Sequence, residues 1–98
     1  MTFYYSNDVV LIEGSFTDSA GTATDPTALT LVVQPYKGTA VTYEYPADIT
    51  KDATGEYSME WTAPTVTHLT VYGVQWLPTG AVQRASDPVW ISVDPVLG

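Results

Sequence analysis

The sequence predicts an all-β protein, built as an antiparallel β-sandwich of about seven strands. Residues 56–62 carry the clearest signal, because Tyr57, Met59 and Trp61 alternate with small or polar side chains at the period of a half-buried strand. Three large side chains on one face of a short strand require a second sheet to cover them. No stretch shows helical periodicity, and turn residues recur at the spacing of sandwich strands.

The composition indicates one domain with a substantial core. The chain has 98 residues, of which 45% are hydrophobic and only 14% charged, so it can bury a core and is not compositionally disordered. It contains no cysteine, which excludes a disulfide and any thiolate metal site. Length and turn spacing together are typical of an immunoglobulin-like sandwich. We expect residues 1–7 to form an aromatic N-terminal arm, 8–93 the sandwich and 94–98 a short C-terminal tail.

The charge balance excludes two classes of partner. Eleven acids against three bases give a net charge of −8, which opposes binding to nucleic acid or to an anionic membrane surface. The N-terminus lacks the basic region of an export signal, and no apolar run is long enough to span a bilayer. With no cysteine present, these features favour assembly in a cytoplasm.

The first strand is expected at residues 8–17, with Val10, Ile12, Gly14 and Phe16 facing the core. A glycine inside a strand indicates either a bulge or a close approach by another part of the backbone.

The second strand, residues 27–34, follows a loop rich in Gly, Asp and Ser at 18–26. Its leucines and valine alternate with other residues, so Leu29, Leu31 and Val33 should face the core.

The middle of the chain is predicted to form a series of hairpins. Residues 35–38 should connect the second strand to a third at 40–45. A short edge strand at 47–51 and a tight turn at 52–55 then lead into the strand at 56–62.

The last two strands are expected at 67–77 and 81–93, joined by a hairpin turn at Pro78-Thr79-Gly80. Proline at position 88 removes a hydrogen-bond donor, so the final strand should lie at a sheet edge or bend at Asp87-Pro88.

Aromatic side chains outside the core are the interface candidates. Three adjacent aromatics in the arm cannot all face inward on one strand, so the arm either adds to a sheet edge, covers its own sandwich or lies on another subunit. Trp90 is out of phase with its apolar neighbours and should point outward, and Tyr36 sits in a hairpin. The candidate interface residues are Phe3, Tyr4, Tyr5, Tyr36 and Trp90.

The sequence offers no catalytic constellation. His68 is the only histidine and no G-x-S-x-G motif occurs, so a nucleophilic triad has no marked partners. Glu56 and Glu60 could suggest a glycosidase pair, but they belong to the face opposite the core residues of their strand, where exposed acids are ordinary. We predict no enzyme activity, no catalytic residue and no cofactor.

Calcium is the metal to consider, because carboxylates are plentiful and loops at sandwich ends can supply oxygen ligands. The possible pairs are Asp18 with Asp25 and Asp48 with Asp52. Neither pair matches the spacing of a calcium-binding loop, and Asp18 and Asp52 are more simply turn-capping residues. We therefore predict no metal site.

Several turn motifs follow one another along the chain in a characteristic order. They are Thr17-Asp18 with Gly21, Thr24-Asp25-Pro26-Thr27, Pro35 with Gly38, Asp52-Ala53-Thr54-Gly55-Glu56-Tyr57, and residues 79–85. In this succession residues 9–93 resemble small immunoglobulin-like structural proteins of tailed bacteriophages. The segment Asp52 to Tyr57 is also similar to the tyrosine corner of immunoglobulin domains, although Met59 stands where a cysteine would be.

The resemblance implies a non-enzymatic virion component, either a capsid decoration (cement) protein or part of the neck, tail or baseplate. Its partners would be other virion proteins and copies of itself, and it would assemble in the host cytoplasm. The alternative is a surface-displayed immunoglobulin-like module that contacts host glycans through its end loops and Trp90. The start at Met1 argues against a third reading, an accessory domain cut from a larger enzyme.

Overall fold

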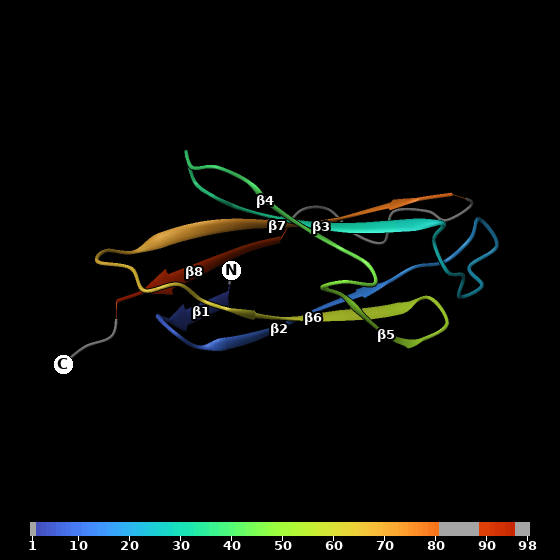
Figure 1. The fold of residues 1–98 in the computed structure, drawn as a ribbon, viewed down its shortest axis with the longest axis horizontal. Coiled ribbons are helices and arrows are strands. Elements are labelled where there is room, and N and C mark those ends of the chain that lie inside the picture. The colour runs from blue at the N-terminus through green and yellow to red at the C-terminus, as the bar shows by residue number, and fades with distance from the viewer. Residues whose placement is uncertain (1, 81–88, 96–98) are drawn as a thin grey trace.

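The computed structural model describes residues 2–80 and 89–95, and that part of the chain is all-β, with eight strands and no helix. The strands are β1 (Thr2–Tyr5), β2 (Val9–Ser15), β3 (Ala28–Pro35), β4 (Val41–Glu44), β5 (Thr50–Ala53), β6 (Glu56–Thr62), β7 (Thr70–Thr79) and β8 (Val89–Asp94). They form a five-stranded sheet of order β1-β8-β7-β3-β4 and a three-stranded sheet of order β2-β6-β5. The two sheets lie over one another as two layers (Figure 1). The all-β prediction is confirmed.

The strand count exceeds the expected seven because residues 2–5 are a strand. β1 pairs in parallel with β8, with Phe3 opposite Ser92 and Tyr5 opposite Asp94. The chain is held again just after β1, where the Ser6 amide donates to the Asp94 carbonyl oxygen at 2.8 Å. Of the three placements open for the arm, the structure has the first, addition to a sheet edge.

This pairing corrects the expectation for the last strand. β8 has β1 on one side and β7 on the other, so it is an interior strand and not an edge. The bend expected at Asp87-Pro88, and the predicted strand residues 81–88, lie outside the described residues.

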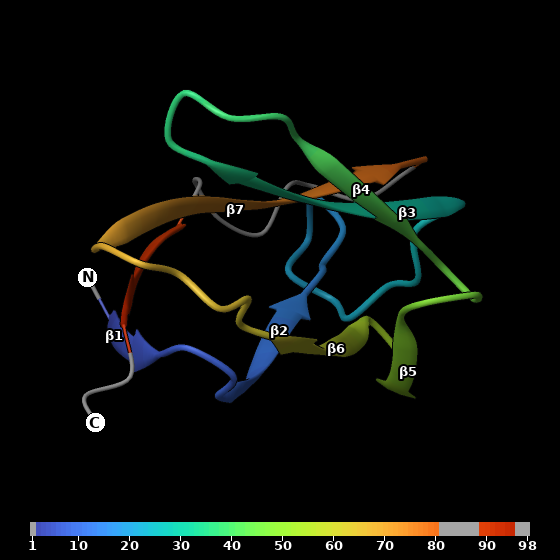
Figure 2. The same cartoon turned by 60° about the vertical axis from the view of Figure 1, so that its left-hand side comes forward.

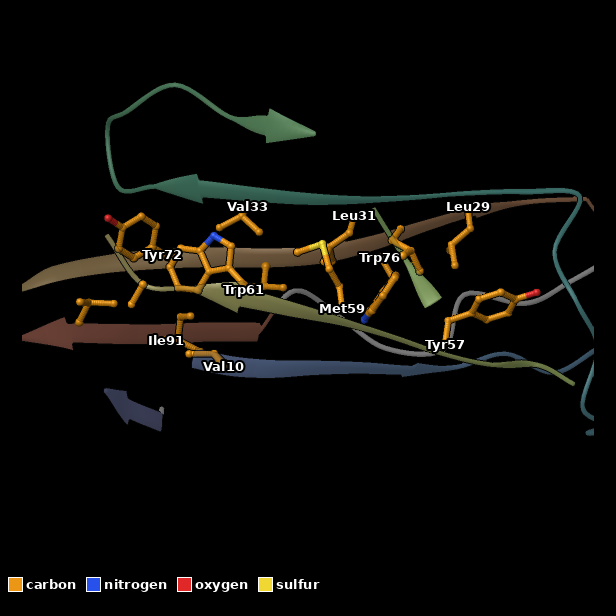
Figure 3. Close-up of a cluster of buried hydrophobic side chains, with 14 of the residues drawn as sticks. Val10, Leu29, Leu31, Val33, Tyr57, Met59, Trp61, Tyr72, Trp76 and Ile91 are labelled. Atoms are coloured by element: carbon orange, nitrogen blue, oxygen red, sulfur yellow. The ribbon is translucent and has the colours of Figure 1, made fainter. Parts of the chain in front are cut away.

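The core lies between the sheets and uses every second residue of each central strand (Figure 3). Tyr57, Met59 and Trp61 of β6 are at most 7% exposed, as their spacing predicts. Burial of each large side chain contributes a few kcal/mol. The side chains that face them from the other sheet are Leu29, Leu31, Val33, Tyr72, Val74, Trp76, Ile91 and Val93.

Gly14 is explained by a tryptophan from the opposite sheet. β2 pairs with β6 along its whole length without a bulge. A Cβ atom on Gly14 would lie 2.8 Å from the indole ring of Trp76, so only glycine leaves room for that ring. The Trp76 indole N–H donates to the Glu13 carbonyl oxygen at 3.1 Å. The close approach predicted at Gly14 therefore comes from a side chain rather than from backbone.

Two predicted turns are shifted. Pro78 and Thr79 belong to β7, where they pair with Leu29 and Ala28, so no hairpin turn forms at those two residues. Asp52 and Ala53 belong to β5, which begins later than the predicted edge strand at 47–51. Turn propensity was overridden here because pairing with a neighbouring strand satisfies the same backbone groups.

Candidate functional site

The outer face of the five-stranded sheet carries most of the predicted interface residues. Phe3, Tyr5, Tyr36 and Trp90 are 68%, 53%, 70% and 50% exposed. Tyr4 points the other way, because neighbours along a strand face opposite sides, and it packs against the core. The structure therefore removes Tyr4 from the candidate surface and keeps the other four.

Tyr36 and Trp90 line one shallow groove on this face, with a volume of about 290 Å³. The carboxamides of Gln34 and Gln75 line the same groove. Gly73 stands opposite Trp90 on β7, and a Cβ atom there would lie 2.9 Å from the indole. The glycine thus makes room for the ring over β7. Strand order brings together two rings that lie 54 positions apart in sequence, which local sequence patterns cannot reveal.

The outer face of the three-stranded sheet is acidic instead. A wide depression of about 690 Å³ is lined by Glu13, Glu56 and Glu60 together with Asp48 and Asp52. Glu56 and Glu60 are exposed there, on the face opposite the core, as expected. This side of the molecule repels acidic partners.

The described part of the chain offers no metal-binding cluster, and its histidine lies at the surface. His68 is exposed, and its Nδ1 lies 3.3 Å from the Thr67 hydroxyl. No group of three or more His, Cys, Asp or Glu side chains is placed to hold a metal ion within residues 2–80 and 89–95. That same part of the chain contains no helix able to cross a membrane.

Three of the four aspartates considered for calcium, Asp18, Asp25 and Asp48, accept hydrogen bonds from the protein. Asp18 caps its own turn, since its Oδ1 accepts from the amides of Ala20 and Thr22 at 2.9 and 3.0 Å. Asp48 accepts from the Glu44 amide at 3.1 Å. Asp52 lies in β5, within a strand rather than a turn.

Asp25 forms the most connected polar cluster of the described structure. Its Oδ1 accepts from the Gly55 amide at 2.8 Å and from the Tyr57 hydroxyl at 3.0 Å, and its Oδ2 pairs with Lys51 at 2.7 Å. These contacts fasten the loop at 18–26 to the β5–β6 hairpin. We call Asp25, Lys51, Gly55 and Tyr57 the loop clamp.

The loop clamp perturbs the protonation of its members. The hydrogen bond from Lys51, followed by the one from the Gly55 amide, lowers the pKa of Asp25. The bond to Asp25 raises the pKa of Lys51. Burial, followed by the hydrogen bond to Asp25, raises the pKa of Tyr57 to about 12.

The loop clamp gives a physical reason for two of the sequence motifs. The Thr24–Thr27 motif supplies the carboxylate, and the Asp52–Tyr57 motif supplies the amide and the hydroxyl that it binds. The likeness to a tyrosine corner is wrong in detail. A corner tyrosine donates to backbone a few residues upstream, whereas Tyr57 donates to the Asp25 side chain.

No protein-family model matches the chain, and no curated protein is significantly similar to it in sequence.

Replacing Tyr57 by phenylalanine should lower the free energy of unfolding by about 1 kcal/mol at pH 7, because one partly buried hydrogen bond is lost. The difference between wild type and Tyr57→Phe should shrink from pH 10 to pH 12. In that window the unfolded tyrosine loses its proton while the folded one keeps it, so rising pH favours unfolding of the wild type. Urea unfolding across this range tests the expectation, and a constant difference would contradict it.

The stability contributed by Asp25 depends on pH in the opposite sense to that of Tyr57. Folding lowers the pKa of Asp25. Its contribution to the free energy of unfolding is therefore present at pH values above the ordinary aspartate pKa, and it is lost as the pH falls through the pKa of the folded protein. Asp25→Asn should therefore lose stability at neutral pH and show a weaker dependence on acid than the wild type.

Proposed function

We propose that this protein is a non-enzymatic structural component of a tailed-phage virion and contacts its neighbours through the outer face of the five-stranded sheet. The observation that carries the proposal is the exposure of Phe3, Tyr5, Tyr36 and Trp90 on this one face. Aromatic side chains are enriched at interfaces and supply much of their binding energy. The order of turn motifs that resembles phage structural proteins supports the same function.

Strand order supports an immunoglobulin-like fold within this proposal. β3, β7 and β8 are neighbours, like strands C, F and G of immunoglobulin domains, and β2, β6 and β5 follow the order B, E, D. β4 then takes the place of strand C′ beside β3. The chain departs from the pattern in two respects, because it lacks the inter-sheet disulfide and β3 contains no tryptophan.

Virion assembly suits a small domain with modest contacts. Many copies held in fixed symmetric geometry convert weak individual contacts into strong attachment. The protein would act as a decoration or cement protein on the capsid, or as part of the neck, tail or baseplate. Its acidic outer face would then remain directed away from the contact.

Immunogold electron microscopy tests this proposal. Antibodies raised against the purified protein are applied to phage particles from the organism that carries the gene, and the same particles are analysed by mass spectrometry. The expected result is a label at one location on the particle and a peptide signal from the protein. Particles that lack both the label and the peptides would overturn the proposal.

The groove beside Trp90 favours one alternative function, a binding module that contacts host glycans. An aromatic ring offers a stacking surface for a sugar ring, and the Gln34 and Gln75 carboxamides offer both donors and acceptors to hydroxyl groups. Tyr36 lines the same groove and supplies a second ring.

Titration with oligosaccharides, followed by tryptophan fluorescence and a glycan array, distinguishes the alternative. Glycan binding requires a saturable change that Trp90→Ala abolishes. Phe3→Ala is the matched control, because Phe3 is an exposed aromatic on the same sheet but does not line the groove. No saturable change with any sugar would remove this alternative.

A further inference from the structure

β2 is the longest and most regular of the strands at the borders of the two described sheets. The other border strands, β1, β4 and β5, have four residues each, and β5 also contains a lysine and a register shift. β2 has seven residues and keeps one register with β6 throughout. Short length, lysine and bulges normally prevent a border strand from pairing with another chain, so β2 is the border most open to pairing. Figure 2 shows β2 at the border of its sheet, with β6 beside it.

The backbone groups of β2 that point away from β6 belong to odd-numbered residues. Beside the two ends of the strand, the Asp8 carbonyl oxygen accepts from the Ala63 amide and the Phe16 amide donates to the Gly55 carbonyl oxygen, so even-numbered positions bond to β6. In an antiparallel pair the groups of alternate residues point the other way. Within the part of the chain that the structure describes, the outward row has one hydrogen bond, from the Trp76 indole to the Glu13 carbonyl oxygen. An added strand would therefore meet donors and acceptors that are still open.

An apolar slot opens beside this border, between the two sheets. It has a volume of about 180 Å³, and the side chains that line it include Val10 and Ile12 of β2, Val74 and Trp76 of β7, and Ile91 of β8. The slot is smaller than the usual cavity for a small-molecule ligand, about 300–1,000 Å³. A strand paired with β2 would direct every second side chain into it, because side chains alternate between the two faces of a sheet. Branched apolar side chains suit these positions.

The outer side of the same border is negatively charged. Glu13 lies on β2 itself, and on β6 Glu60 lies opposite Leu11 and Glu56 opposite Ser15. All three carboxylates line the acidic depression. A lysine or arginine opposite Glu13 would be stabilising, whereas another carboxylate would be destabilising. Because this chain carries a net charge of −8, the charge at the border favours a basic partner over a second copy.

We propose that the border of β2 binds an extended segment of another protein in which basic and branched apolar side chains alternate. The segment pairs antiparallel with Val9–Ser15 and extends the three-stranded sheet to the order partner-β2-β6-β5. Its basic side chains lie beside Glu13 and Glu56 on the outer face, and its apolar side chains fill the slot. Backbone hydrogen bonds supply affinity for any extended segment, and the two kinds of side chain select this partner.

The binding site at β2 is separate from the outer face of the five-stranded sheet, through which the virion contacts are proposed. Binding at β2 is measured on purified protein, whereas the virion function is measured on particles, so each can fail while the other stands.

The peptide KTRVTITK, blocked at both ends, is a probe with the required alternation. Paired antiparallel with residues 8–15, it places arginine opposite Glu13, valine opposite Ile12 and isoleucine opposite Val10. Calorimetric titration up to about 1 mM peptide, which covers affinities into the millimolar range, should show saturable binding. Wild-type protein that shows no saturable binding of this peptide would overturn the proposal.

Two further peptides separate charge from strand pairing. ETEVTITE keeps the apolar residues and reverses the charge. KTRVPITK keeps the charge and places proline opposite Leu11, where the peptide N–H would otherwise bond to β2. Both should bind about tenfold more weakly than KTRVTITK, or less. Equal binding of ETEVTITE would rule out selection by charge, and equal binding of KTRVPITK would rule out strand pairing; either result contradicts the proposal.

Glu13→Gln tests the carboxylate on β2, and Glu44→Gln is the matched control. Both substitutions remove one exposed negative charge, but Glu44 lies on β4 in the other sheet. Glu13→Gln should bind KTRVTITK several-fold more weakly than the wild type, and Glu44→Gln should bind it equally well. Circular dichroism verifies that both variants are folded. An equal loss in both would mean that net charge alone attracts the peptide, contrary to the proposal.

Hydrogen exchange of the wild type locates the bound peptide without any substitution. With saturating KTRVTITK, the amides of Val9, Leu11 and Glu13 should exchange about tenfold more slowly, while those of Val10 and Ile12, which face β6 in either state, should change little. Equal changes at odd and even positions, or no change, would exclude pairing at this border. Protection that grows with protein concentration in the absence of peptide would identify a second copy as the occupant instead, which would also overturn the proposal.

Discussion

Trp76→Ala is expected to lower the free energy of unfolding by about 3–5 kcal/mol, the largest effect of any single substitution considered for this protein. The side chain is only 6% exposed and comes from the middle of the five-stranded sheet. It fills the space over Gly14 and meets Phe16 edge-on, with ring centroids 6.0 Å apart. Truncation also removes the donor to the Glu13 carbonyl oxygen. A cavity and a lost hydrogen bond therefore act together.

Trp90→Ala is the matched control for Trp76→Ala. Trp90 is also a tryptophan on the five-stranded sheet, but it lies on the outer face and is 50% exposed. Its removal should cost clearly less, about 1–2 kcal/mol, because half of the side chain is already exposed and no enclosed cavity forms. Urea unfolding followed by far-ultraviolet circular dichroism measures both variants. A comparable loss from the two substitutions would contradict the assignment of inner and outer faces.

Gly55→Ala is expected to have the second-largest effect, a loss of about 2–4 kcal/mol. Gly55 has φ of +73°, a conformation that costs energy for any residue with a Cβ atom. An added Cβ would also lie 2.6 Å from the Phe16 carbonyl oxygen and 2.9 Å from the Thr24 amide nitrogen. Both of these atoms are backbone and cannot swing aside. The substitution should therefore push the loop at 18–26 away and break the loop clamp.

Gly21→Ala separates the two causes of that loss. Gly21 has a similar φ of +84°, but nothing lies within 4 Å of an added Cβ atom. It should cost only about 1 kcal/mol, the price of the backbone conformation alone. Thermal unfolding of both variants tests the expectation. If Gly21→Ala were as destabilising as Gly55→Ala, steric contact with the loop would not be the cause.

The candidate surfaces were only partly visible in the sequence. The phase of Trp90 against its neighbours predicted that this side chain points outward, and the structure confirms it. The same reasoning could not place Tyr36 beside Trp90, because the groove forms across three strands. Tyr4 is among the predicted interface residues because three consecutive aromatics do not show which of them faces the core. That becomes clear only when the pairing partner of their strand is known. The parallel pairing with β8 fixes which side chains of β1 face the core.

The loop clamp was missed for a related reason. Asp25 stood in the sequence as a calcium candidate, and Tyr57 as a core residue. The useful signal was the pair of turn motifs, Thr24–Thr27 and Asp52–Tyr57, but nothing local says that one turn docks on the other. Only the folded chain brings the Asp25 carboxylate within 3.0 Å of the Tyr57 hydroxyl.

By itself, the sequence determined the all-β class, the absence of disulfides and which side chains of the strands at 8–17, 27–34 and 56–62 face the core. These follow from residue alternation, because each side chain's face depends only on its position in its own strand. The tertiary structure decided strand order and the capture of residues 2–5 by β8. Those features depend on contacts between distant segments, and many local patterns are compatible with each such contact.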